Sequence, residues 1–146
     1  MSLTSDIERL LPHRKPFLFV DEIISCDDAG SVSTRKFTED DFFFKGHFPQ
    51  YPVVPGVILI ETMAQAGGAA LSYQKKFSDD SLFFLGTVDK VKFKNQVRPG
   101  DTVRMEIKNL RVSPRMIKQS GKAFVADTLC AEAEWMCLVG EADQVK

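Results

Sequence analysis

The second half of the chain is dominated by stretches in which apolar and polar residues alternate, the pattern of β-strands with one buried face. Such stretches cover residues 82–96, 102–112, 116–126 and 129–139, and short turns separate them. Turns this short predict that neighbouring strands pair antiparallel. The alternation changes parity near Asn109, which predicts a β-bulge.

The first half predicts a short helix, two strands and an irregular segment. Ser5 is a candidate N-cap for a helix over residues 5–11, because Glu8 occupies the capping-box position. Residues 17–25 and 31–37 have the composition of strands. Regular structure is not expected between Asp40 and Pro55, where three prolines remove amide donors.

A long, mostly apolar segment follows Pro55 and predicts a helix to about Lys76, roughly 30 Å in length. Residues 53–73 also reach the roughly 20 residues that a membrane span requires. The polar and glycine residues within this stretch, and the alternating strands beside it, favour a helix buried in a soluble core. We therefore expect no membrane span.

One long apolar helix and about six strands predict an α+β fold in which a curved antiparallel sheet wraps around the helix. This architecture is the hotdog fold. Residues 1–146 form a single domain in this interpretation, because the chain shows no linker or repeat. An exposed edge of such a sheet would favour dimerisation by strand addition.

Composition narrows the classes of function. The 19 basic and 20 acidic side chains leave a net charge of -1, which gives no support for nucleic-acid binding. Three cysteines without CxxC spacing predict neither a disulfide framework nor a metal site. Together with an N-terminus that lacks signal-peptide features, they predict a cytoplasmic protein. Twelve phenylalanines indicate either a large apolar core or an apolar slot for a ligand.

A narrow stripe of polar and small residues follows one face of the long helix: Glu61, Gln65, Gly68 and Ser72. A lone carboxylate buried among apolar residues is costly unless it is paired or protonated. Glu61 is therefore a candidate acid. Alternatively, Glu61 reaches solvent at a groove or pairs with an arginine.

Two further positions are candidates for a chemical role, and the second histidine of the chain is not. His47, in the irregular segment, titrates near neutral pH and is a candidate base. Gly56 lies where the amides of the long helix begin, and these amides could stabilise an oxyanion. His13 lies just past the end of the first predicted helix, where capping or a turn contact explains it without chemistry.

Several uncommon strings occur in order over residues 7–139. They are LPHR at 11–14, PFL at 16–18, VD at 20–21, GHFP at 46–49, PGV at 55–57, MAQA at 63–66, DKVKF at 89–93, PGD at 99–101 and AEAE at 131–134. With these spacings the chain resembles the (3R)-3-hydroxyacyl-[acyl-carrier-protein] dehydratases of FabZ type.

The resemblance implies a hotdog fold and the elimination of water from a 3-hydroxyacyl thioester in fatty acid biosynthesis. It makes His47 and Glu61 the catalytic pair, with the Gly56 amide on the thioester carbonyl. Gln65 is a further candidate at the oxyanion or substrate site, and it could orient a protonated Glu61. It also implies a homodimer whose sites combine the histidine of one subunit with the glutamate of the other, and three such dimers can form a hexamer. The substrate is carried on the phosphopantetheine of acyl carrier protein, and no metal or redox cofactor is expected. Whether Glu61 or His47 returns the proton to the leaving hydroxyl stays open.

Two surfaces follow from this interpretation. The four phenylalanines that crowd the His47 segment are candidates for the wall of an acyl tunnel: Phe42, Phe43, Phe44 and Phe48. A basic run is a candidate docking face for the acidic carrier protein, although a solvated strand face also explains it: Lys90, Lys92, Lys94 and Arg98. Lys45 and the pair Gln50-Tyr51 depart from the residues common among such dehydratases, which affects the tunnel mouth or the docking face.

Competing functions remain open. An isomerising dehydratase would typically carry aspartate in place of Glu61. A hotdog thioesterase would hydrolyse similar thioesters but typically lacks a histidine and a glutamate at this separation. A non-catalytic acyl-binding hotdog module would need neither His47 nor Glu61.

Overall fold

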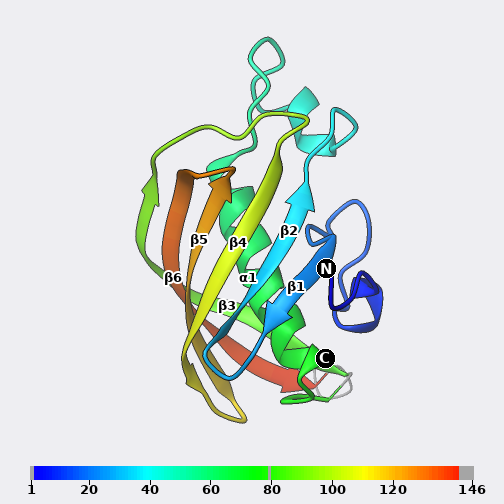
Figure 1. Ribbon diagram of the computed structural model, residues 1–146, viewed down its shortest axis with the longest axis vertical. Helices are drawn as coiled ribbons and strands as arrows, with labels where there is room; N and C mark the ends of the chain where they lie inside the picture. The colour runs from blue at the N-terminus through cyan, green and yellow to red at the C-terminus, as the bar shows by residue number, and fades with distance from the viewer. Residues whose placement is uncertain (1, 79, 142–146) are drawn as a thin grey trace.

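A six-stranded antiparallel sheet curves around a single long helix, α1 (Figure 1). The computed structural model describes residues 2–78 and 80–141. The strands lie in the order β1-β2-β4-β5-β6-β3. Their bounds are β1 Glu22–Cys26, β2 Gly30–Lys36, β3 Ser81–Phe93, β4 Thr102–Val112, β5 Met116–Val125 and β6 Thr128–Glu141, and the helix is α1 Gly56–Tyr73. The predicted hotdog fold is confirmed.

Helix α1 forms because an apolar, proline-free run follows Pro55, whose extended backbone caps the helix. Most of its side chains are buried against the inner face of the sheet. A Cβ on Gly67 would lie 2.2 Å from Gln119 Oε1, so this glycine allows a close approach of helix and sheet. Gln119 in turn accepts a hydrogen bond from Trp135 Nε1 at 3.1 Å and donates one to Asn109 at 2.8 Å. Each buried polar group of this contact thus has a partner.

The N-terminal segment differs most from the sequence predictions. The expected helix over residues 5–11 is a single 3₁₀ turn, Ile7–Arg9. Asp6 rather than Ser5 precedes it, and no side chain caps it, so the capping-box prediction is wrong. The first strand begins at Glu22 rather than residue 17, because the backbone of Phe17 and Phe19 bonds to helix α1 instead of to a strand. A second 3₁₀ helix, η2 Phe42–Lys45, lies within the segment expected to be irregular.

Four register shifts interrupt the pairing of the described long strands, and two of them bear on the sequence predictions. The bulge predicted near Asn109 is confirmed by a register shift between Asn109 and Arg111. A second shift, between Asp89 and Lys92 of β3, was not predicted. Lys90 has a φ of 53° there, in the left-handed region that few non-glycine residues adopt. The regular alternation expected for residues 90–94 is therefore broken at Lys90.

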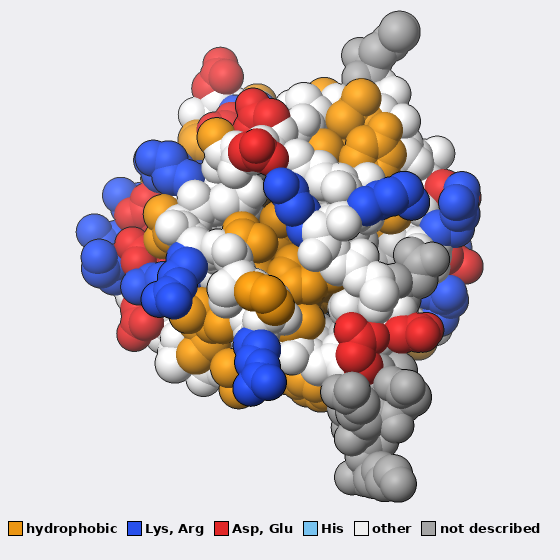
Figure 2. Space-filling model, turned by 90° about the horizontal axis from the view of Figure 1, so that it is seen from below, with side chains coloured by type: hydrophobic (Ala, Val, Ile, Leu, Met, Phe, Trp, Pro, Cys, Tyr) orange, Lys and Arg blue, Asp and Glu red, His pale blue; other side chains and the backbone are white. Residues whose placement is uncertain are grey.

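Strand β3 lies at one edge of the sheet and exposes several large apolar side chains: Phe84, Leu85, Val91 and Phe93. Phe84 pairs in register with Leu138, and Leu138 with Met116, which places three apolar residues in a row across the sheet. Seen from the end opposite the His47 loop, the surface shows an apolar area with lysines and arginines around it (Figure 2). Among the described residues, no helix has the length and apolar character needed to cross a membrane.

Candidate active site

The loop between η2 and α1 holds His47 by its backbone and by its ring. The His47 amide donates to Phe43 O at 2.9 Å, and ring atom Nδ1 lies 3.1 Å from Val53 O. Because a carbonyl oxygen can only accept, Nδ1 carries the hydrogen of the neutral ring. The lone pair is then on Nε2, which makes Nε2 the basic atom. Phe48 stacks on the imidazole with centroids 4.0 Å apart.

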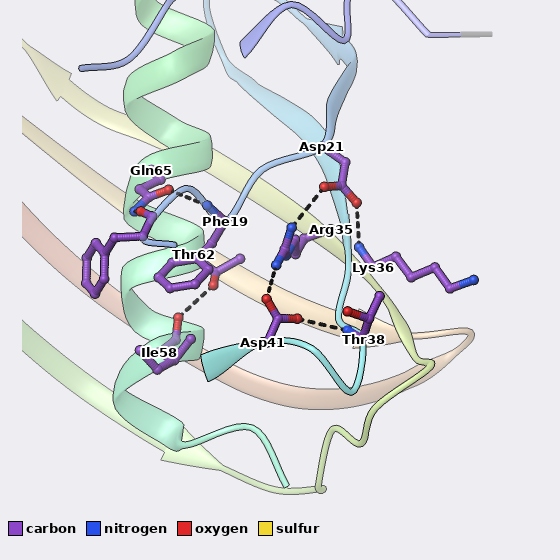
Figure 3. Close-up of polar contacts among 10 residues, drawn as sticks. Phe19, Asp21, Arg35, Lys36, Thr38, Asp41, Ile58, Thr62 and Gln65 are labelled. Atoms are coloured by element: carbon purple, nitrogen blue, oxygen red, sulfur yellow. Dashed lines mark hydrogen bonds and ion pairs between the residues drawn. The ribbon is translucent and has the colours of Figure 1, made fainter. Parts of the chain in front are cut away.

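Arg35 anchors the segment before η2 to the sheet (Figure 3). Its guanidinium donates to Asp21 Oδ1 at 3.2 Å and to Asp41 Oδ1, and its side chain is only 15% exposed. The other oxygen of each carboxylate accepts a hydrogen bond from a backbone N–H. Asp21 Oδ2 accepts from the Lys36 amide at 2.7 Å, and Asp41 Oδ2 accepts from the Thr38 amide at 2.8 Å. The polypeptide that leads into η2 is thus fixed by charge-assisted hydrogen bonds.

Glu61 lies in the second turn of α1, and its side chain is 25% exposed rather than fully buried. Its Oε2 accepts a 2.9 Å hydrogen bond from Gln65 Nε2, one turn along the helix. Glu61 is therefore neither isolated nor paired with an arginine, and its partial exposure agrees with the alternative that it reaches solvent. Burial raises the pKa of the nearby Cys137 thiol to about 12, and the Glu61 charge adds to this shift.

Gln65 is fully occupied by contacts within the chain. Its Oε1 accepts from the Phe19 amide at 2.8 Å (Figure 3). Its Nε2 donates to Phe17 O and to Glu61 Oε2, both at 2.9 Å. The residue is 2% exposed. Both amide hydrogens are in use, so the expected contact of Gln65 with substrate does not fit. The hydrogen bond to Glu61 Oε2 agrees with the other possibility considered from the sequence, that Gln65 orients Glu61.

Glu61 has a neighbour, His13, that the sequence patterns did not predict. His13 Nε2 lies 3.6 Å from Glu61 Oε2, an ion-pair distance slightly too long for a hydrogen bond. His13 follows the first 3₁₀ turn, as expected, but its ring contacts α1 instead of serving only a turn. Only tertiary structure joins residues that lie so far apart in the sequence. His13 does belong to the LPHR string, one of the strings in which the chain resembles the FabZ-type dehydratases.

Gly56 begins α1, as predicted. The Gly56 and Val57 amides have no acceptor within the described residues, which leaves two donors at the positive end of the helix dipole. A Cβ at Gly56 would lie 2.7 Å from Cζ of Phe93. The aromatic ring of the edge strand β3 therefore lies directly against the start of the helix.

Among the described residues, no hydrogen bond or ion pair joins His47 to Glu61. The four phenylalanines also separate. Phe43 and Phe44 are buried in the core, where Phe43 packs against Phe19 and Phe37, so they do not form an open tunnel wall. Phe42 lines a surface hollow with Arg35, and Phe48, 53% exposed, stacks on His47.

The basic run divides into two parts. Lys90 and Lys92 lie 3.3 and 3.9 Å from Glu134 and Glu132, and both line a hollow of about 630 Å³ on the outer face of the sheet. Their charge is thus balanced within the chain, which weakens the expected docking role. Arg98 bonds to the Tyr51 hydroxyl and stacks over its ring, 4.5 Å from the centroid. Lys94 is exposed nearby in sequence. Within the described part of the chain, no three potential metal ligands cluster.

Comparison with known proteins places this architecture among the FabA-like domains. The model of the FabA-like domain matches residues 11–134. Among solved structures, a chain of the dehydratase heterocomplex ApeI:P from Xenorhabdus doucetiae superposes with a TM-score of 0.82, at 19% identity, covering 94% of this chain and 93% of that one. The uncharacterized protein PH1136 from Pyrococcus horikoshii superposes with a TM-score of 0.65, at 13% identity and with the same coverage. These likenesses bear on the fold alone.

Similarity in sequence identifies the family, whereas the structural likenesses identify only the fold. The 3-hydroxyacyl-[acyl-carrier-protein] dehydratase FabZ of Desulforamulus reducens is 41% identical over 136 residues, covering 92% of this chain and 95% of the relative. The FabZ of Clostridium perfringens is 39% identical over 136 residues, with 93% and 97% covered. The chain belongs to the FabZ family within the FabA-like domains.

Proposed function

We propose that the protein is a (3R)-3-hydroxyacyl-[acyl-carrier-protein] dehydratase of fatty acid biosynthesis, a hydro-lyase that forms the trans-2-enoyl thioester. The observation that carries this proposal is the 41% identity, over 92% of the chain, to a FabZ dehydratase. The orientation of His47, with Nε2 left as the basic atom, gives the chemistry a physical basis.

Each candidate side chain has a distinct role in this reaction. His47 Nε2 removes the α-proton of the thioester, and the electrons of that C–H bond form the new double bond as the C–O bond to the β-hydroxyl breaks. The free amides at Gly56 and Val57 stabilise negative charge that develops on the thioester oxygen. The hydroxyl leaves as water after it receives a proton from Glu61 or from the newly protonated His47. No step requires a metal or a redox cofactor.

We further propose that the working unit is a homodimer with shared sites. Two observations support this: β3 forms an edge of the sheet, and exposed apolar side chains such as Phe93 lie on that edge. His47 and Glu61 also have no direct contact within one chain among the described residues. Unpaired edge strands are natural sites for strand addition. A hexamer of three dimers is an extension of the same proposal.

The catalytic proposal is tested with a 3-hydroxyacyl thioester of acyl carrier protein, by following enoyl absorbance for the wild type, His47→Ala and Glu61→Gln. We expect enoyl product from the wild type and a large loss of rate in both variants. The proposal fails if the wild type makes no enoyl product, or if both variants keep full activity. Release of free thiol would instead show a thioesterase, and tight binding without turnover would show a non-catalytic acyl-binding module.

The shared site is tested by subunit complementation. A heterodimer of one His47→Ala chain and one Glu61→Gln chain contains one intact site if the two residues act across the interface, and none if they act within a chain. We expect about half of the wild-type rate from the purified heterodimer and little from either parent homodimer. An inactive heterodimer would exclude the shared site without affecting the dehydratase proposal.

Docking of acyl carrier protein is proposed to use Lys94 and Arg98 rather than Lys90 and Lys92. The carboxylates of Glu132 and Glu134 already neutralise the latter pair. Arg98→Gln is expected to raise KM for the carrier-bound substrate with little change in kcat, and Lys90→Gln serves as its control. We also propose a cytoplasmic location, which agrees with the three unpaired cysteines.

A further inference from the structure

The two carboxylate oxygens of Glu61 have different surroundings. Oε2 accepts from Gln65 Nε2 at 2.9 Å and faces His13 Nε2 at 3.6 Å. Oε1 has no partner among the described residues. The side chain is 25% exposed, so the carboxylate remains accessible. One oxygen is thus held by the protein, while the other is left for a ligand.

The ring of His13 is itself constrained. Its Nδ1 is buried and has no hydrogen-bond partner among the described residues. A proton on Nδ1 would be a buried donor without an acceptor, which is costly, whereas an unused lone pair costs less. The neutral ring therefore carries its hydrogen on Nε2, the atom that faces Glu61.

Burial lowers the pKa of His13 below its ordinary value, and the negative charge of Glu61 opposes that shift. The other charged group beside His13 is Arg14, whose Nη1 donates to the carbonyl oxygens of His13 and Leu11 and whose Nε lies 3.7 Å from Glu8. On β6, burial and then the charge of Glu61 raise the pKa of the Cys137 thiol, which therefore stays protonated at neutral pH. Glu61 is thus the acidic group that His13 meets from helix α1.

We propose that His13 is a positioning residue that acts through Glu61. The Gln65 amide holds Oε2 by a hydrogen bond, and the polar Nε2–H of the neutral His13 ring faces the same oxygen from 3.6 Å, which favours this orientation of the carboxylate. Oε1 is then the oxygen that exchanges a proton with the substrate hydroxyl. This inference rests on the proposed dehydratase function for its kinetic consequence, but the contact itself is testable without substrate.

The contact is tested by nuclear magnetic resonance. The chain has two histidines, so a His13→Gln variant assigns both ring Cε1 resonances. In the wild type we expect His13 to titrate below its ordinary range and its ¹⁵N shifts to show the Nε2–H tautomer. In Glu61→Gln the His13 pKa should fall further, because the charge that opposes the effect of burial is removed. An unchanged midpoint in Glu61→Gln, or the Nδ1–H tautomer, overturns the proposal.

The kinetic arm compares His13→Phe, which fills the site but cannot donate, with His13→Gln, which keeps an N–H donor. We expect His13→Phe to lower kcat by roughly ten- to a hundredfold with little change in KM, and His13→Gln to recover most of this loss. Lys15→Gln, an exposed neighbour, is the control, and circular dichroism confirms folding. Equal losses in Phe and Gln variants that are both folded overturn the positioning role. A fully active Glu61→Gln would also overturn the positioning role, because His13 is proposed to act through Glu61. Absence of enoyl product from the wild type would instead show that the dehydratase proposal is at fault.

Discussion

Gln65 and Glu61 lie one turn apart on α1, and the Gln65 amide donates a 2.9 Å hydrogen bond to Glu61 Oε2. The same amide group also bonds to the backbone of Phe17 and Phe19. The orientation of the candidate catalytic carboxylate therefore depends on the N-terminal loop as well as on the helix. This explains why residues 17–21 leave the strand that their composition predicts.

Replacing Gln65 by Leu should reduce both stability and activity. The variant leaves the buried Phe19 amide and the Phe17 carbonyl without partners, at a cost of about 1–3 kcal/mol for each unsatisfied group. It also frees Glu61 to adopt other rotamers, so we expect kcat to fall. Urea unfolding and steady-state kinetics measure the two effects. Gln74→Leu, at the C-terminal end of α1 and without a side-chain hydrogen bond, is the matched control and should change neither.

Replacing Gly56 by Ala should lower kcat/KM about tenfold or more, because the methyl group obstructs the free amides at the helix start. The new Cβ would lie 2.7 Å from the Phe93 ring, which must move aside. The double variant Gly56→Ala with Phe93→Ala distinguishes obstruction of the amides from the clash with the Phe93 ring, because it removes only the clash. We expect it to regain the thermal stability of Phe93→Ala alone while its activity stays low. Full activity of Gly56→Ala would argue against a role for these amides.

The sequence predicts those parts of the fold that local patterns encode. Alternation along residues 102–112 gives β4 with its correct bounds and its bulge, and the apolar run after Pro55 gives α1 to within a few residues. The edge strand is predicted less well. The bulge at Lys90 moves side chains between faces, and no turn residue marks it in the sequence.

Contacts between distant segments explain what the sequence misses at the candidate site. His13 meets Glu61, and Phe19 meets Gln65, only after the N-terminal loop packs on α1. Phe43 and Phe44 look equivalent to Phe42 and Phe48 in a run of aromatics, yet the one-turn helix η2 directs them into the core. Residue type alone does not distinguish these outcomes.

Replacing Arg35 by Met should destabilise the fold by about 3 kcal/mol, since removing one partner of a largely buried ion pair leaves the other charge uncompensated. Asp41 is 11% exposed and would be the main unpaired group. Because this network anchors the loop toward His47, we also expect lower activity at temperatures well below unfolding. Arg104→Met breaks an exposed pair with Glu106 on the same sheet and should cost less than about 1 kcal/mol. Equal effects of the two substitutions would contradict this assignment.

Cys137 should make the stability of the protein depend on alkaline pH. Burial raises the pKa of its thiol from 9.0 to about 12 in the folded state. Between these values the unfolded chain releases the proton and the folded chain keeps it, so stability falls as pH rises, by at most about 1.4 kcal/mol per pH unit from this group. Cys137→Ala removes this contribution while the other alkaline titrations remain. Urea unfolding under reducing conditions at several pH values from neutral to about 10 should therefore give a shallower decline for the variant. Parallel declines would show that the thiol is not protected by burial.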